Sequence, residues 1–215
     1  MLKRALLLLV AALFTGAMAA PALAATGQTP QQVVQAIADE LGTEVQGHQA
    51  ELRQHPEQMV GIIDKVLLPH FDLNYSALLV LGRYARQATP AQRVAFTRAF
   101  YDALMQRYAS ALIGFTRGAV KVLPSDAPLD QQRTLVRTQM TLNNGKSLSV
   151  DYAFHKTQSG QWKAYDVLIE GISYVTVYRS QVAGEIQKEG IEGLIKQLQS
   201  QGAGAINQMK QGGKG

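Results

Sequence analysis

Cysteine is absent from this chain of 215 residues, and charged side chains make up only 17% of it. Without cysteine there is no disulfide framework, no thiol chemistry and no attachment site for the lipid of a lipoprotein. The four histidines are His48, His55, His70 and His155, and no two of them lie three or four residues apart. That spacing excludes a histidine pair on one face of a helix, so we expect no metal and no cofactor.

Familiar catalytic motifs are also missing. The chain has no G-x-S-x-G elbow, no P-loop and no G-x-G-x-x-G after a predicted strand. Asp166 and Glu170 share one face of a predicted strand but lie roughly 13 Å apart, too far for paired-carboxylate glycoside chemistry. Asp151 on the neighbouring strand can approach Asp166, and a lone Asp among apolar side chains can act as a proton-transfer base. The alternative is that these acids face solvent or pair with Arg137 and Lys163.

Long apolar runs are lacking everywhere except at the N-terminus. There, Lys3 and Arg4 precede an apolar stretch at residues 6–14, and residues 22–24 (Ala-Leu-Ala) have the small side chains that a signal peptidase reads. We predict a signal peptide over residues 1–24, with the Ala-Met-Ala at 17–19 as a second cleavage site. An uncleaved anchor is the alternative, although the apolar stretch is short for a membrane span. The mature chain is therefore expected to be exported and soluble.

Cleavage after residue 24 lowers the net charge from +5 to +3, because Lys3 and Arg4 are the only charged residues removed. The remaining Lys and Arg side chains are dispersed along the chain. A nucleic-acid-binding protein usually gathers them into one patch or stripe, so this composition argues against such a partner.

Helical periodicity dominates the first half of the mature chain. Thr-Pro-x-Gln occurs at residues 29–32 and again at 89–92, which predicts a capping box at the start of two helices. Further helices are predicted over residues 56–69 and 73–81, the latter capped by Asp72. The helix after residue 90 has the most regular apolar stripe, with one residue in every four: Phe96, Phe100, Leu104, Tyr108 and Leu112.

The period then changes to two. Strands are predicted over residues 119–123, 134–142, 148–154 and 162–172, with hairpin turns at Asn144-Gly145 and Ser159-Gly160. Helices are predicted again from Tyr174 to Gly190 and over 191–198. This order indicates an α+β fold, with helices packed on one face of a twisted antiparallel sheet. We expect one domain over residues 25–205 and a flexible tail over 206–215, where Gly, Gln and Lys dominate.

Large apolar side chains are more numerous than one core-facing stripe requires, notably at residues 78–81 and 174–178. They are consistent with an ordinary core that includes a dimer contact. They are equally consistent with the lining of a cavity for an apolar ligand.

Several strings of residues resemble the MlaC family, which are periplasmic phospholipid-binding proteins also described as toluene-tolerance auxiliary proteins. The strings are residues 150–152, 160–173, 178–179 and 190–195, with Gly-Gln-Trp-Lys-Ala-Tyr-Asp-Val-Leu-Ile-Glu-Gly-Ile-Ser as the longest. Phe71-Asp72, Leu81-Gly82 and the stripe of the long helix extend the resemblance over the mature chain. Three positions depart from the family pattern, namely Tyr84, Val177 and Val182, and these departures bear on the shape of a pocket.

The resemblance implies a cone-like fold related to nuclear-transport-factor-like domains, with acyl chains between sheet and helices and the headgroup in solvent. It implies a periplasmic carrier that moves phospholipid between an outer-membrane lipoprotein–porin complex and an inner-membrane ABC transporter with an MCE subunit. Such a carrier maintains the lipid asymmetry of the outer membrane. The resemblance also implies that the bound phospholipid is cargo and that the protein is not an enzyme.

On this reading, twelve apolar or aromatic side chains are candidates for lining the lipid pocket. They are Leu78, Leu81, Phe96, Phe100, Leu104, Met140, Val150, Tyr152, Val167, Ile169, Tyr174 and Tyr178. Arg179 is a candidate for holding a phosphate, although a pair with Asp151 or Glu170 is equally consistent with its position. The alternative function is an isomerase-like or dehydratase-like enzyme with Asp166 or Asp151 as base. A third is a ligand-free module whose apolar surface binds proteins.

Overall fold

A computed structural model describes residues 27–125, 131–142 and 144–212 of the chain. The predicted signal peptide at residues 1–24 lies outside the described residues. Seven α-helices are present in that described part: α1 (Pro30–Val45), α2 (Gln49–Gln54), α3 (Glu57–Val66), α4 (Leu73–Leu81), α5 (Pro90–Tyr108), α6 (Tyr174–Gln201) and α7 (Ala203–Gly212). The same part contains three 3-10 helices: η1 (Leu68–His70) between α3 and α4, η2 (Gly82–Arg86) between α4 and α5, and η3 (Ala109–Gly114) after α5. In the same part of the chain, each helix is too short or too polar to cross a membrane.

The strands form one six-stranded antiparallel sheet. They are β1 (Val120–Val122), β2 (Arg133–Val136), β3 (Thr138–Thr141), β4 (Ser147–Lys156), β5 (Trp162–Ile169) and β6 (Ile172–Ser173). Their order is β1-β3-β4-β5-β6, and β2 continues the line of β3 along β4. The predicted α+β class, with helices packed against an antiparallel sheet, is confirmed.

Local side-chain signals set the helix starts as predicted. The Thr29 and Thr89 hydroxyls each accept a hydrogen bond from the backbone N–H three residues later, and the glutamine side chain there accepts one from the threonine N–H. Asp72 caps α4 by accepting from the Tyr75 N–H at 3.0 Å. The predicted break at Gly190 is also present, because its φ of 72° and ψ of 171° interrupt α6. That conformation is available essentially to glycine alone.

Two predicted strands are interrupted in the structure. Residues 134–142 divide into β2 and β3 because the Thr138 N–H donates to the Asp151 carboxylate at 3.2 Å rather than to the backbone ladder. The predicted strand 162–172 ends at Ile169 and turns through Glu170 and Gly171, both with positive φ, into β6. A bulge also leaves Tyr165 without a partner on β4, so the alternation of β5 changes there.

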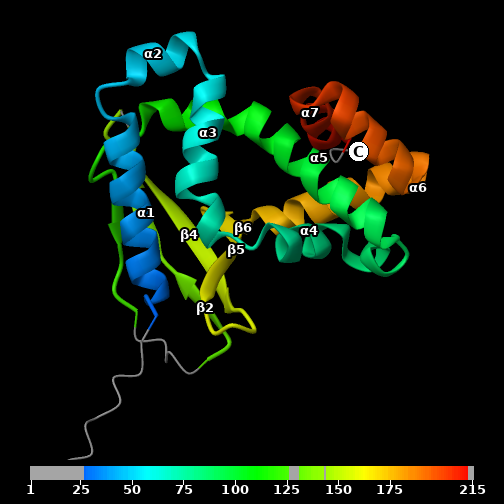
Figure 1. Ribbon diagram of the computed structural model, residues 1–215, viewed down its shortest axis with the longest axis horizontal. Helices are drawn as coiled ribbons and strands as arrows, with labels where there is room; N and C mark the ends of the chain where they lie inside the picture. The colour runs from blue at the N-terminus through cyan, green and yellow to red at the C-terminus, as the bar shows by residue number, and fades with distance from the viewer. Residues whose placement is uncertain (1–26, 126–130, 143, 213–215) are drawn as a thin grey trace, which may run out of the picture.

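The core consists of three groups of buried apolar side chains. One lies among α4, α5, α6 and α7, a second among α1, α2, α3, η3 and β1, and a third between α1 and the sheet. Figure 1 shows α1 along the sheet on one side of the molecule and α4 to α7 gathered on the other. Between these two parts, α3, η1 and β5 border the space where the candidate site lies.

The prediction of a flexible tail from residue 206 is wrong for the part that the structure describes. α7 covers Ala203–Gly212, and Ile206 and Met209 are each only 1% exposed. These two side chains and Ala205 form a narrow apolar stripe that packs into the group shared by α4, α5 and α6. The prediction rested on the many Gly, Gln and Lys residues of this segment. Composition does not reveal that three apolar side chains among them are spaced to lie on one face of a helix.

Candidate binding cavity

A cavity of about 240 Å³ lies between the helices and β5. Its wall is made by η1 and the end of α3, by one face each of α4 and α5, by β5, and by the first turns of α6. The lining residues are Ile63, Leu67, Leu68, Phe71, Leu73, Ser76, Ala77, Val80, Phe100, Tyr101, Leu104, Met105, Tyr108, Tyr165, Asp166, Val167, Tyr174, Val175 and Tyr178. Nearly all of these are aliphatic or aromatic, so the cavity suits an apolar ligand.

The polar groups in this wall mostly bond to one another or to the backbone. The Ser76 hydroxyl donates to the Tyr165 carbonyl oxygen at 2.7 Å, and the Tyr101 hydroxyl donates to the Asp64 carboxylate. The hydroxyls of Tyr108 and Tyr178 share a hydrogen bond of 2.8 Å. Such pairing leaves mainly carbon surface facing the cavity.

A second cavity of about 140 Å³ adjoins the first on the side of α1. It is lined by Val34, Ile37, Ala38, Leu41, Leu67, His70, Phe71, Leu112, Phe115, Val120, Met140, Tyr152, Phe154, Ala164 and Val167. Leu67, Phe71 and Val167 line both cavities. Only apolar side chains are shared between the two spaces, so they form one continuous apolar region of the fold.

Tyrosines in these walls are held in their neutral form. Burial raises the pKa of Tyr152 to about 12, with a smaller contribution from the neighbouring Asp151. Burial also raises the pKa of Tyr178, and the hydrogen bond that it shares with Tyr108 adds to that effect. Both shifts have the same physical cause, which is that an apolar environment disfavours the phenolate. Tyrosine ionisation therefore contributes no charge to the cavity at neutral pH.

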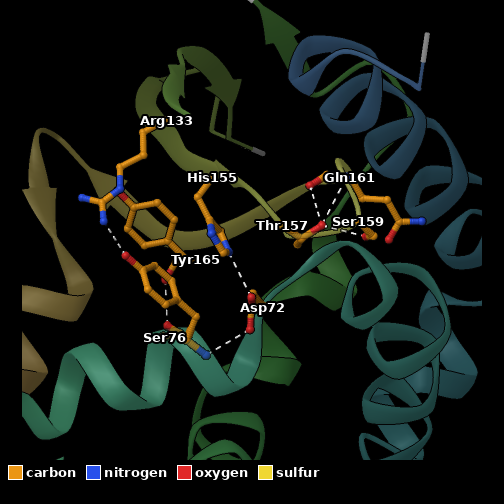
Figure 2. A network of polar contacts seen from close by, with 9 residues as sticks. Asp72, Ser76, Arg133, His155, Thr157, Ser159, Gln161 and Tyr165 are labelled. Atoms are coloured by element: carbon orange, nitrogen blue, oxygen red, sulfur yellow. Dashed lines mark hydrogen bonds and ion pairs between the residues drawn. The ribbon is translucent and has the colours of Figure 1, made fainter. Parts of the chain in front are cut away.

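A network of polar contacts attaches α4 to the sheet beside the larger cavity (Figure 2). Asp72, which caps α4, also pairs with His155 on β4 at 3.0 Å. The Tyr75 ring stacks on the His155 ring with centroids 4.4 Å apart, and Arg133 on β2 donates to the Tyr75 hydroxyl at 2.7 Å. The Ser76 bond to Tyr165 completes the attachment. We interpret this network as structural, since each of its groups bonds to another part of the fold.

Asp166, one of the two candidate catalytic bases, is a residue of β5 and is only 7% exposed. Its side chain lies beside the first residues of α6. Its carboxylate accepts a hydrogen bond of 2.6 Å from the Ser173 hydroxyl and one of 3.0 Å from the Val175 N–H. A negative charge here is favourable because the first N–H groups of a helix lack partners within the helix. Asp166 therefore anchors α6 to β5, which is a sufficient structural reason for its burial.

Asp151, the other candidate base, is similarly engaged. Besides the Thr138 N–H, its Oδ1 accepts from the Ser149 hydroxyl at 3.4 Å. It does not line either cavity. Among the described residues, no group of three or more His, Asp or Glu side chains is placed to bind a metal ion. Both candidate bases are therefore engaged in hydrogen bonds that hold parts of the fold together.

The structure brings seven of the twelve predicted pocket residues to the two cavities. Phe100, Leu104, Val167, Tyr174 and Tyr178 line the larger one, while Met140, Tyr152 and again Val167 line the smaller one. The long helix therefore does turn part of its regular stripe toward a cavity.

The other five candidates lie elsewhere. Leu81, at the end of α4, and Phe96 are packed in the core among α4 to α7. Phe96 lies there because the stripe of α5 passes from the cavity into that core toward the N-terminal end of the helix. Val150 is buried outside both cavities, Leu78 is 37% exposed and Ile169 is half-buried. The position of each of these side chains depends on which other helix packs against it. The periodicity of the sequence does not contain that information.

Arg179, the candidate for holding a phosphate, lies outside the lining of both cavities. Its side chain is exposed, and its Nε donates to the Leu79 carbonyl oxygen at 2.6 Å, near the end of α4. It pairs with neither Asp151 nor Glu170, and it does not line either cavity. The Glu170 carboxylate instead accepts from the Ser149 N–H at 2.6 Å.

Sequence reasoning missed the contribution of η1 and its flanks. Leu67, Leu68 and Phe71 border the larger cavity, yet Pro69 between them indicated only the end of a helix. A short isolated bridge between Phe71 and Ala164 holds this segment against β5. The signal available was the density of apolar side chains around a proline, which marks a buried connection as readily as a helix end.

Comparison with known proteins places this architecture in a family. The MlaC protein family matches residues 35–200, which include nearly all residues of both cavities. The chain is 31% identical over 190 residues to the toluene tolerance protein ttg2D of Pseudomonas putida, covering 88% of this chain and 84% of that one. It is 28% identical over 173 residues to the intermembrane phospholipid transport system binding protein MlaC of Haemophilus influenzae, covering 80% and 81%.

A solved structure is similar over most of the fold. The phospholipid-binding protein of Ralstonia solanacearum, determined in complex with a phospholipid, is 28% identical and superimposes with a TM-score of 0.75. The match covers 85% of this chain and 99% of that one. With an apolar cavity between helices and sheet and a family match over most of its length, this chain belongs to the MlaC family.

Proposed function

We propose that this protein is a periplasmic phospholipid carrier. The observation that supports it most directly is the apolar cavity between α4, α5, α6 and β5, which adjoins a second apolar cavity toward α1. The relatives support the nature of the cargo, since one is named as a phospholipid transport binding protein and another was solved with a phospholipid bound.

The physical need for such a carrier is large. Each acyl methylene gains about 0.8 kcal/mol on leaving water. A diacyl lipid with about thirty methylenes therefore does not cross an aqueous compartment at useful rates unless its chains are enclosed. A carrier needs an apolar cavity and no catalytic group, which matches the bonded state of Asp166 and Asp151.

For the route, we propose the two membranes of the envelope. An outer-membrane lipoprotein–porin complex and an inner-membrane ABC transporter with an MCE subunit would exchange lipid with this protein, and the exchange would maintain outer-membrane asymmetry. The names of the relatives, which include an intermembrane transport system and toluene tolerance, support this proposal.

The proposed periplasmic location rests on the signal peptide that the sequence predicts. We propose one lipid-binding domain that begins at Ala25 after signal peptidase acts on the Ala-Leu-Ala at residues 22–24. The intact mass of protein recovered from a bacterial periplasm should correspond to a chain that starts at Ala25. A mass that retains residues 1–24 would contradict the proposed cleavage.

The cargo is tested by native mass spectrometry of the same periplasmic material. We expect the folded protein to carry phospholipid, which is released unchanged on denaturation. Incubation with labelled phospholipid should yield neither lysolipid nor free fatty acid. A protein that is consistently empty would contradict the carrier, whereas lipid turnover that a single substitution abolishes would identify an enzyme.

A further inference from the structure

Arg107 lies on α5 between two residues of the cavity wall, three positions after Leu104 and directly before Tyr108. The side chain is half-buried, and its Nε is shielded from solvent without a hydrogen-bond partner among the described residues. Leaving a charged donor buried and unpaired is unfavourable, and native proteins rarely do so without a reason. An Nε in this state indicates a donor that awaits a partner from outside the chain.

Other arginines near this part of the fold already have partners. Arg98 on the same helix pairs with Asp102 at 2.9 Å, and Arg179 donates to the Leu79 carbonyl. Arg107 has no ion pair with any carboxylate in the part of the chain that the structure describes. Its guanidinium carbon lies 5.1 Å from the centroid of the Tyr108 ring, which orients the group without neutralising it.

The charge of Arg107 acts on one end of the larger cavity. That part of the wall holds a tyrosine cluster, which consists of Tyr108, Tyr174 and Tyr178. The hydroxyls of Tyr108 and Tyr178 are 2.8 Å apart and share a hydrogen bond, and the ring centroids of Tyr174 and Tyr178 lie 6.1 Å apart. Burial is the main cause that raises the pKa of Tyr174, and the neighbouring Tyr108 adds a smaller increase. The positive charge of Arg107 lowers the same pKa. The guanidinium is therefore near enough to influence what occupies this end of the cavity.

We infer that Arg107 binds the phosphate of the cargo lipid beside the tyrosine cluster of the larger cavity. This inference rests on the proposed carrier function and adds a headgroup contact to it. A guanidinium presents several N–H donors in a planar fork that matches phosphate oxygens, and its hydrogen bonds to an anion are among the strong ones. The apolar wall below holds the chains, so the two contacts together would set the depth of the lipid.

The test compares a lipid that has the phosphate with one that lacks it. Delipidated protein is incubated with vesicles that contain equal amounts of labelled phosphatidylglycerol and diacylglycerol with identical chains, and the ratio of the two captured lipids is measured. Arg107→Met should lower the phosphatidylglycerol-to-diacylglycerol ratio by about tenfold relative to the wild type, as expected for a lost hydrogen bond to a charged group. A ratio is insensitive to any loss of folded protein, because both lipids compete for the same molecules.

Arg98→Met is the matched control, since it removes the same charge from the same helix at an exposed side chain that already pairs with Asp102. It should leave the ratio unchanged. An unchanged ratio in Arg107→Met, or an equal drop in both variants, would overturn the inference. A wild type that captures neither lipid would instead contradict the carrier function itself.

Free phosphate is the other source of the same chemistry. We expect inorganic phosphate, compared with chloride at equal ionic strength, to leave the melting temperature of the delipidated wild type unchanged. A rise that disappears in Arg107→Met would assign the site to free phosphate and overturn the assignment to a lipid headgroup.

Discussion

Replacing Leu104 with tryptophan is expected to abolish most lipid binding while leaving the empty protein as stable as the wild type. Leu104 is half-buried on α5 and lines the larger cavity. If the indole displaces about three methylenes of an acyl chain, affinity falls by about 2.4 kcal/mol, or roughly 50-fold. The measurements are the phospholipid retained per protein and the melting temperature of the delipidated form, since bound lipid itself raises apparent stability.

Phe96→Trp is the matched control for Leu104→Trp. Phe96 lies on the same helix but is fully buried in the packed core among α4 to α7, outside both cavities. Enlargement there should strain the fold by about 1–3 kcal/mol and lower the melting temperature by several degrees, with lipid still bound. If instead Leu104→Trp lost stability and kept its lipid, Leu104 would belong to the packed core and the lipid would lie elsewhere.

Replacing Asp166 with alanine is expected to be strongly destabilising. The substitution removes the acceptor for the Ser173 hydroxyl and leaves the Val175 N–H buried without a partner at the start of α6. Hydrogen bonds to charged groups contribute about 1.5–3 kcal/mol each, so we expect the loss of these two bonds to cost about 3–6 kcal/mol. Urea unfolding of the delipidated protein measures it, and phospholipid binding should persist in whatever fraction remains folded.

Two further variants make the role of Asp166 specific. Asp166→Asn keeps the volume and one acceptor oxygen, so its loss should be smaller than that of the alanine variant. Asp102→Ala removes a carboxylate from an exposed pair with Arg98 and should change stability by less than about 1 kcal/mol. A fully stable Asp166→Ala protein would mean that the buried carboxylate does not anchor α6, and its burial would then require a functional explanation.

Several features of the fold were predictable because they depend on neighbours in the chain. The capping boxes at Thr29 and Thr89, the Asp72 cap and the break at Gly190 all form as the sequence indicates. Each rests on hydrogen bonds or backbone angles within a few residues, so a short stretch of sequence contains all the information. The change from a helical period to a period of two likewise predicted the sheet.

The candidate site was predictable only in part. The stripe on α5 indicated which side chains face inward, and the structure divides that stripe, with Phe100 and Leu104 at the cavity and Phe96 in the packed core. The division depends on α6 and α7, which follow α5 in the chain by more than sixty residues. The periodicity of α5 does not show where α6 and α7 will pack against it.

Sequence by itself thus determined the starts of α1, α4 and α5, the change from helices to an antiparallel sheet, the lack of thiol chemistry and the family resemblance. Tertiary structure alone decided that Asp166 anchors a helix, that Ala203–Gly212 forms α7 with Ile206 and Met209 buried, and that Arg107 has a donor without a partner among the described residues. The physical reason is the distance along the chain over which each interaction acts. Caps and periodicity act through bonds within one or two turns, whereas burial and hydrogen-bond partners are set by segments that meet only when the whole chain has folded.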